Sequence, residues 1–148
     1  MLWDDLKQPI YDKWKAHWYE THPKEIAEYS WEYLFTGGKE IRARLFCELW
    51  HYLSPDSEVC GELAFAMECI HVASLILDDS PWMDRASLRR GRPTLHIQFS
   101  NRKALLLCHD VLRMVYYIWI SNCPSSFTET DWKEYLRSKL FRLTIGQY

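Results

Sequence analysis

The fold of this chain is indicated by residues 60–84, which read CGELAFAMECIHVASLILDDSPWMD. Apolar residues recur there at helical spacing and Pro55 lies just upstream, so we expect a helix of about 22 residues ending at Asp78 and Asp79. The run from Val72 to Leu77 contains one polar residue and leads directly into the two carboxylates. This placement is costly unless a cation receives the carboxylates, so the stretch predicts a core helix that ends at a cation site.

Helical spacing continues through most of the sequence, whereas no segment alternates cleanly enough to predict a strand. The further predicted helices are Leu6–Tyr19, Lys24–Phe35, Lys39–Leu53, Asn101–Ile120 and Trp132–Tyr148. We expect residues 81–93 to form a loop or a short broken helix. The predicted fold class is all-α, with one domain over residues 1–148.

Composition excludes several classes of protein. The 18 Lys and Arg residues nearly balance 20 Asp and Glu residues, so the chain lacks the basic footprint of a nucleic-acid binder. Its 48% apolar and 16% aromatic content excludes a disordered chain. The N-terminus, MLWDD, is acidic where a targeting peptide is basic, and the apolar run Val111–Ile120 is about half the length of a membrane span. We therefore expect a soluble cytoplasmic protein that does not span a membrane.

The five cysteines are odd in number and form no C-x-x-C pair. We expect them to be reduced core thiols in a reducing compartment.

Three carboxylates and an arginine pair form the main candidate site. Asp78, Asp79 and Asp84 suit Mg²⁺, which prefers one or two carboxylates together with phosphate oxygens and water. Arg89 and Arg90 add planar guanidinium groups that match phosphate geometry. The sequence therefore predicts a Mg²⁺-diphosphate site. The plainer alternative is that the aspartates only end an exposed helix and the arginines lie on a solvated face.

A second cluster lies at residues 36–42, TGGKEIR. The glycines allow a tight turn before a helix, and Lys39 and Arg42 are expected on one face of its first turn, where the helix N-terminus and two cations form an anion site. His71 lies two turns before Asp78 on the same helix face, at about 10 Å. The alternatives are an ordinary glycine turn and a core histidine.

These motifs occur together in an order that resembles the trans-isoprenyl diphosphate synthases, which include farnesyl and geranylgeranyl diphosphate synthases. Residues 68–84 continue into residues 88–96, LRRGRPTLH, and Gly37–Lys39 with Arg42 and the pair Gly146-Gln147 match further family motifs. The resemblance spans Thr36 to Tyr148. It implies an antiparallel helical bundle of the isoprenoid synthase type and a homodimer, or a heterodimer with a synthase subunit.

The resemblance implies a prenyltransferase that ionises an allylic diphosphate (dimethylallyl, geranyl or farnesyl) and joins the carbocation to isopentenyl diphosphate. Mg²⁺ on Asp78 and Asp84 would hold the allylic diphosphate, with Asp79 supporting that shell. The substrate-binding residues implied by the resemblance are Lys39, Arg42, His71, Arg89, Arg90 and Gln147. Of these, Arg89 would contact the allylic diphosphate, and Lys39, Arg42, His71 and Arg90 would hold isopentenyl diphosphate.

The chain also departs from the family pattern. Ala43 stands where a proline is usual, Leu77 where many members have histidine, and the second aspartate-rich motif is absent. We therefore expect a bundle truncated before its second half, and no chain elongation by this chain alone. The alternatives are a class I terpene cyclase, which the cluster at residues 36–42 disfavours, and a non-catalytic diphosphate-binding or regulatory subunit.

Product length is expected to depend on Ala73 and Ser74. Position 73 lies five residues before Asp78 and is aromatic in many farnesyl diphosphate synthases. The small side chains of Ala73 and Ser74 leave room for one more five-carbon unit. The resemblance therefore predicts geranylgeranyl diphosphate as the product of the full-length enzyme.

Overall fold

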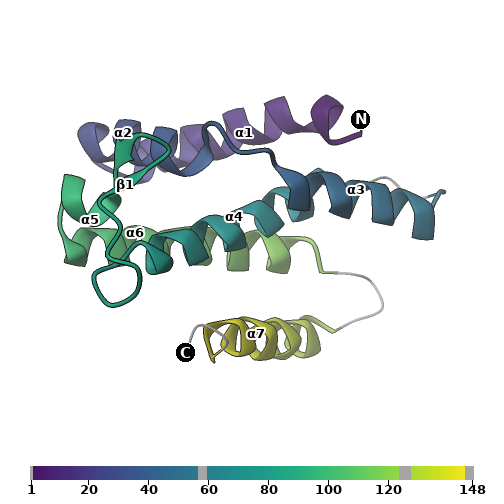
Figure 1. Cartoon of the computed structure of the whole chain (residues 1–148). Coiled ribbons are helices and arrows are strands. Elements are labelled where there is room, and N and C mark those ends of the chain that lie inside the picture. Colours follow the sequence, from purple (N-terminus) through teal and green to yellow (C-terminus); the bar gives the residue numbers. More distant parts are fainter. Residues whose placement is uncertain (1, 57–59, 124–127, 146–148) are drawn as a thin grey trace.

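The computed structural model describes residues 2–56, 60–123 and 128–145, and these ranges are dominated by helices (Figure 1). The helices are α1 (Leu2–Thr21), α2 (Lys24–Phe35), α3 (Ile41–Leu53), α4 (Gly61–Asp78), α5 (Leu95–Gln98), α6 (Asn101–Ser121) and α7 (Glu129–Ile145). The strands β1 (Leu88–Arg89) and β2 (Arg92–Pro93) form a short antiparallel hairpin. The predicted all-α class is confirmed.

Helix α4 lies at the centre of the fold. It runs alongside α6 over their shared length, and α1 and α2 lie together on one side of this pair (Figure 1). Helix α7 packs on α6 on the other side. The aspartates at the end of α4 therefore lie beside the hairpin and α5, away from the α3 end of the molecule (Figure 1).

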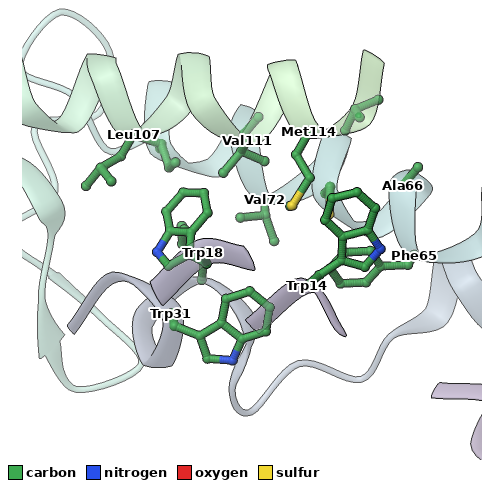
Figure 2. Packing of buried hydrophobic residues seen from close by; sticks show 14 of the residues in the cluster. Trp14, Trp18, Trp31, Phe65, Ala66, Val72, Leu107, Val111 and Met114 are labelled. Carbon is green, nitrogen blue, oxygen red and sulfur yellow. The ribbon is translucent and has the colours of Figure 1, made fainter. Parts of the chain in front are cut away.

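The core is unusually rich in tryptophan. Trp14 and Trp18 of α1 lie toward Val111 and Met114 of α6, and Trp31 of α2 packs against Trp18 on the side away from α6 (Figure 2). The indole Nε1 of Trp18 donates to Ser30 Oγ at 2.9 Å, so the polar atom of this 2% exposed ring is satisfied. Rings of this size bury about 150–250 Å² each and dominate the energetics of a small core.

Several helix starts differ from the sequence prediction: α4 has 18 residues rather than about 22, and α7 begins at Glu129 rather than at Trp132. Helix α1 begins at Leu2 rather than Leu6, because Trp3 is fully buried and anchors this first turn in the core. Helix α3 begins at Ile41 rather than Lys39, because Glu40 has a φ of 50° and cannot continue a right-handed helix. Lys39 therefore precedes the helix.

The cysteines are free thiols, as expected. Cys47, Cys69 and Cys108 are buried, whereas Cys60 and Cys123 are half-buried. Burial raises the pKa of the Cys108 thiol to about 11, which leaves it almost entirely protonated near neutral pH. These three buried cysteines thus act as small core residues.

Among the described residues, α6 alone is long and apolar enough to cross a membrane when judged by length and composition. In the fold, Val111, Val115 and Ile118 of this helix are fully buried within the protein core. About 39% of its apolar window is buried inside the fold, and other large side chains of α6, such as Leu106 and Tyr117, are exposed.

Candidate diphosphate site

The end of α4 turns back on itself and brings Asp84 next to Asp78. The backbone N–H of Asp84 donates to the carbonyl of Asp78 at 2.9 Å, and the N–H of Arg85 donates to the carbonyl of Ser80 at 3.0 Å. Asp78 is half-buried and Asp84 exposed, and within the described part of the chain neither carboxylate has a hydrogen-bond or ion-pair partner. Two carboxylates on one tight turn are thus available for a cation.

Asp79 faces the protein interior instead. Its side chain is only 4% exposed, and Oδ2 accepts from the Tyr33 hydroxyl at 2.6 Å and from Arg89 Nε at 2.6 Å. Its Oδ1 accepts from Arg89 Nη2 at 2.8 Å. Both oxygens are therefore engaged by strong, charge-assisted hydrogen bonds.

The ion pair with Asp79 still leaves Arg89 able to bind an anion. Among the residues that the structure describes, two of its five N–H groups are used, so three remain. The carboxylate of Asp79 raises the pKa of Arg89, and burial together with Asp79 raises the pKa of Tyr33. Arg89 stays charged and Tyr33 stays a hydroxyl donor near neutral pH.

The arginines are presented by a hairpin that sequence patterns did not predict. Arg90 and Gly91 form its two-residue turn with φ values of 50° and 76°, the left-handed pair typical of a type I′ turn. A glycine at the second central position of RRGR was the available signal, but an arginine at the first is unusual there. The turn lets Arg90 Nη1 donate to the carbonyl of Thr36 at 2.8 Å, which ties the hairpin to the glycine loop.

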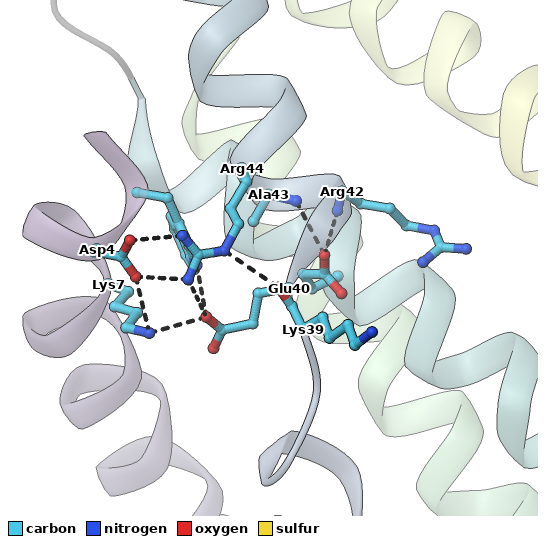
Figure 3. Close-up of polar contacts among 9 residues, drawn as sticks. Asp4, Lys7, Lys39, Glu40, Arg42, Ala43 and Arg44 are labelled. Atoms are coloured by element: carbon cyan, nitrogen blue, oxygen red, sulfur yellow. Dashed lines mark hydrogen bonds and ion pairs between the residues drawn. The ribbon is translucent and has the colours of Figure 1, made fainter. Parts of the chain in front are cut away.

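The N-terminus of α3 is not the open anion site that the sequence suggested. The Glu68 carboxylate of α4 is 8% exposed and accepts from the backbone N–H groups of Arg42 at 2.7 Å and Ala43 at 3.0 Å (Figure 3). The protein's own carboxylate occupies this helix terminus. Proline at position 43, which is usual in the family that the sequence resembles, has no N–H and could not donate this bond.

Lys39 and Arg42 do not share the first turn of α3, because Lys39 precedes that helix. Both side chains nevertheless extend to the same side, away from Asp4 and Lys7 (Figure 3). The two cations therefore face one region despite the later helix start.

A network around Glu40, absent from the sequence prediction, anchors this loop to α1. Glu40 Oε2 accepts from Trp3 Nε1 at 3.1 Å and from Lys7 Nζ at 3.0 Å (Figure 3). Arg44 donates to both Asp4 oxygens at 2.6 and 2.7 Å. These bonds hold the segment before α3 in its left-handed conformation.

His71 lies where the predicted cations converge. Burial is the largest cause that lowers the pKa of His71. The nearby charge of Arg42 lowers it further, with smaller effects from Arg89 and Arg90. A small cavity beside it is lined in part by Gly38, Glu68 and Arg90. The structure thus places His71 within the electrostatic influence of Arg42, Arg89 and Arg90.

The three predicted metal carboxylates do not form one cluster. Within the described ranges, no three His, Cys, Asp or Glu side chains lie close enough together to hold a metal ion. Asp78 and Asp84 fit a Mg²⁺ ion whose shell is completed by phosphate oxygens and water, whereas Asp79 is directed to Arg89. Gln147, the remaining predicted site residue, lies outside the described residues.

The two residues linked to product length have different surroundings. Ala73 is 2% exposed, and its carbonyl accepts from the Cys108 thiol at 3.5 Å across the α4–α6 contact. Ser74 is half-buried and donates to the carbonyl of His71 at 2.8 Å. An apolar cavity of about 550 Å³ lies farther along α4, and its lining includes Leu63, Met67, Trp50, Trp119 and Trp132.

Comparison with known proteins relates these features to a family. Residues 23–148 match the family described as polyprenyl synthetase. The chain is 36% identical over 110 residues to the farnesyl diphosphate synthase of Haemophilus influenzae, a match covering 74% of this chain and 37% of the relative. It is 38% identical over 93 residues to geranylgeranyl pyrophosphate synthase 11 of Arabidopsis thaliana, covering 63% of this chain and 25% of the relative.

Solved structures show the same arrangement of helices. An isoprenoid synthase family member from Thermotoga neapolitana superposes with a TM-score of 0.75 at 22% identity, covering 96% of this chain and 54% of that protein. A farnesyl/geranylfarnesyl diphosphate (FPP/GFPP) synthase from Zymomonas mobilis superposes with a TM-score of 0.61 at 28% identity, covering 80% and 46%. The chain therefore corresponds to about half the length of these solved proteins.

Proposed function

Because this chain belongs to the polyprenyl synthetase family, we propose that the complete protein is a Mg²⁺-dependent prenyltransferase that condenses an allylic diphosphate with isopentenyl diphosphate. One observation carries the proposal. The partner-free carboxylates of Asp78 and Asp84 lie at one end of α4, and the cations around His71 lie along the same helix. Two diphosphates could thus be held by separate sets of groups.

The residues divide between the two substrates. Asp78 and Asp84 would hold the Mg²⁺, which neutralises the leaving diphosphate of the allylic substrate. Arg89 would donate to the same diphosphate with the N–H groups that Asp79 leaves free. Lys39, Arg42, His71 and Arg90 would bind isopentenyl diphosphate, with Gln147 completing the substrate-binding set.

We propose geranylgeranyl diphosphate as the product of the complete enzyme. The apolar cavity lined by Leu63 and Met67 supports a long chain, because these residues lie 15 and 11 positions before Asp78. At the helical rise this is about 22 and 16 Å from the aspartate end of α4. Ala73 and Ser74 leave more room at their own positions than an aromatic side chain would.

Product chromatography of the complete enzyme tests this proposal, beside an Ala73→Tyr variant. We expect twenty-carbon product from the unmodified enzyme and a shorter product from the variant. Because Ala73 lies in the tight α4–α6 contact, the variant's melting temperature should be recorded in parallel. A fifteen-carbon product from both proteins contradicts the role of position 73.

The second candidate function is a non-catalytic subunit that binds diphosphate beside a synthase partner. It would use the same partner-free carboxylates of Asp78 and Asp84 and the free N–H groups of Arg89. The matched segments cover 37% and 25% of the two curated relatives. The terpene cyclase alternative is less well supported, because a cyclase has no second diphosphate for the cations around His71.

Binding of inorganic diphosphate to this chain tests the shared chemistry. Calorimetric titration with Mg²⁺ should give tighter binding than titration with EDTA, because phosphate oxygens complete the metal shell. Asp78→Asn and Asp84→Asn should abolish the gain from Mg²⁺, whereas Asp12→Asn on the exposed face of α1 should not. Equal affinity with and without Mg²⁺ contradicts the metal assignment.

Assays with isopentenyl and allylic diphosphates then separate the two candidate functions. We expect no elongation product from this chain alone, since the second aspartate-rich motif is absent from its sequence. Product from the complete protein supports the synthase. Product that appears only after a separate synthase subunit is added supports the subunit function, and size-exclusion chromatography with light scattering would show whether a homodimer or a heterodimer forms.

A further inference from the structure

The buried hydroxyl of Tyr33 lies behind the diphosphate site. We propose that Tyr33 is a positioning residue, which holds the Asp79 carboxylate so that Arg89 presents its free N–H groups to a diphosphate. Tyr33 is 6% exposed, and its hydroxyl lies 2.6 Å from Asp79 Oδ2. The inference rests on the proposed function, because it assigns the purpose of this contact to the same site.

Two contacts from Arg89 alone do not fix the plane of the Asp79 carboxylate. The terminal torsion of an aspartate is broad, so a carboxylate and a guanidinium bound in two-point contact can turn together as one unit. The Tyr33 hydroxyl reaches the same Oδ2 atom from a different element and supplies a third point. With three points fixed, the direction of the three remaining Arg89 N–H groups follows from the position of Tyr33.

The contact also links three elements that are distant in the sequence. Tyr33 belongs to α2, Asp79 caps α4 and Arg89 lies in β1. Without this link, the hairpin strand that carries Arg89 would have fewer ties to the end of α4.

Tyr29 provides a matched control within the same helix. Its ring stacks on that of Tyr33, with centroids 6.3 Å apart and planes 15° apart. Its hydroxyl donates at 2.7 Å to the carbonyl of Pro93 in β2, not to Asp79. Tyr29→Phe therefore removes a hydroxyl from the same tyrosine stack and a hydrogen bond to the same hairpin. It leaves the Asp79 contacts in place.

Binding of inorganic diphosphate with Mg²⁺ to the 148-residue chain tests the proposal. Tyr33→Phe should weaken binding about tenfold, the lower end of the loss expected for one hydrogen bond to a charged group, and Tyr29→Phe should change it less than about twofold. In an Arg89→Lys background, Tyr33→Phe should have little further effect, because both changes act through the same group. Equal losses in Tyr33→Phe and Tyr29→Phe, or an undiminished Tyr33→Phe effect in the Arg89→Lys background, would overturn the proposal.

Exchange of the Arg89 Nε–H proton with water, followed by NMR without ligand, gives a second measurement. Exchange should be slow in the unmodified chain and in Tyr29→Phe, and faster in Tyr33→Phe. Unchanged exchange in Tyr33→Phe overturns the positioning role even if diphosphate binds. Failure of the unmodified chain to bind diphosphate would instead overturn the proposed function. If Tyr33→Phe does not fold, the same exchange measurement is made on the unmodified chain. Fast exchange of the Tyr33 hydroxyl and Arg89 Nε protons refutes the proposal. Slow exchange of both protons that responds to diphosphate supports it.

Discussion

Glu68→Gln should destabilise the protein more than the loss of one charge on an exposed surface would. Glu68 is 8% exposed and accepts two backbone N–H bonds at the start of α3, at 2.7 and 3.0 Å. Glutamine keeps an oxygen acceptor but loses the negative charge that interacts with the helix terminus. Hydrogen bonds to charged groups contribute about 1.5–3 kcal/mol and neutral ones about 0.5–1.5 kcal/mol, so two bonds lose about 2 kcal/mol together.

This loss is large enough to measure by thermal unfolding. An unfolding entropy of about 2.1 cal/mol/K per residue gives about 0.3 kcal/mol/K for 148 residues, so the melting temperature should fall by about 6 °C. Glu62→Gln is the matched control, since Glu62 lies on the same helix and pairs with Lys13 at the surface. That exposed pair should contribute less than about 1 kcal/mol. Equal melting temperatures for the two variants would refute the capping role of Glu68.

Three further predictions follow from the contacts around the site. Ala43→Pro removes one donor to Glu68 and should cost about 1 kcal/mol in urea unfolding, with a less than additive effect when combined with Glu68→Gln. His71 should titrate below 6.5 by NMR, because burial and Arg42 disfavour its charge. The stability that this group contributes is then present above pH 6.5 and is lost as the pH falls toward its folded-state pKa. Glu68→Gln should lower that pKa further. Arg44 lowers the pKa of Asp4 to about 2 from 3.8, so Asp4→Asn should destabilise the protein above pH 4, with the difference vanishing as pH falls to about 2. A difference between Asp4→Asn and the unmodified chain that grows toward pH 2 would contradict this sign.

The features predicted correctly from the sequence are those that local patterns specify. Helix α4 was expected to end at Asp78 and Asp79 because apolar spacing continues to that point, and the structure ends it at Asp78. Helix α6 was expected at Asn101–Ile120 and is found at Asn101–Ser121. Periodicity and local signals such as Pro55 act within a few residues of the chain, so they can be read without knowledge of the fold.

The sequence did not predict how the candidate site residues are connected. The β-hairpin was missed, because Arg90 in a left-handed turn has no common sequence signal. The start of α3 was placed at Lys39, because nothing local showed that Glu40 would be held by Trp3 and Lys7 from α1. Both errors arise where contacts from distant segments override local preference.

The sequence by itself determined an all-helical chain, the family resemblance and the set of aspartates and cations suited to diphosphates. The tertiary structure decided how those groups are used. Asp79 bonds to Tyr33, which lies 46 residues away, and Glu68 caps α3 by accepting from Arg42, which lies 26 residues before it on the chain. Helical period and composition depend on near neighbours, whereas a buried carboxylate must find its donors wherever folding places them, so only the packed structure shows which carboxylates remain available for a metal and which serve the protein itself.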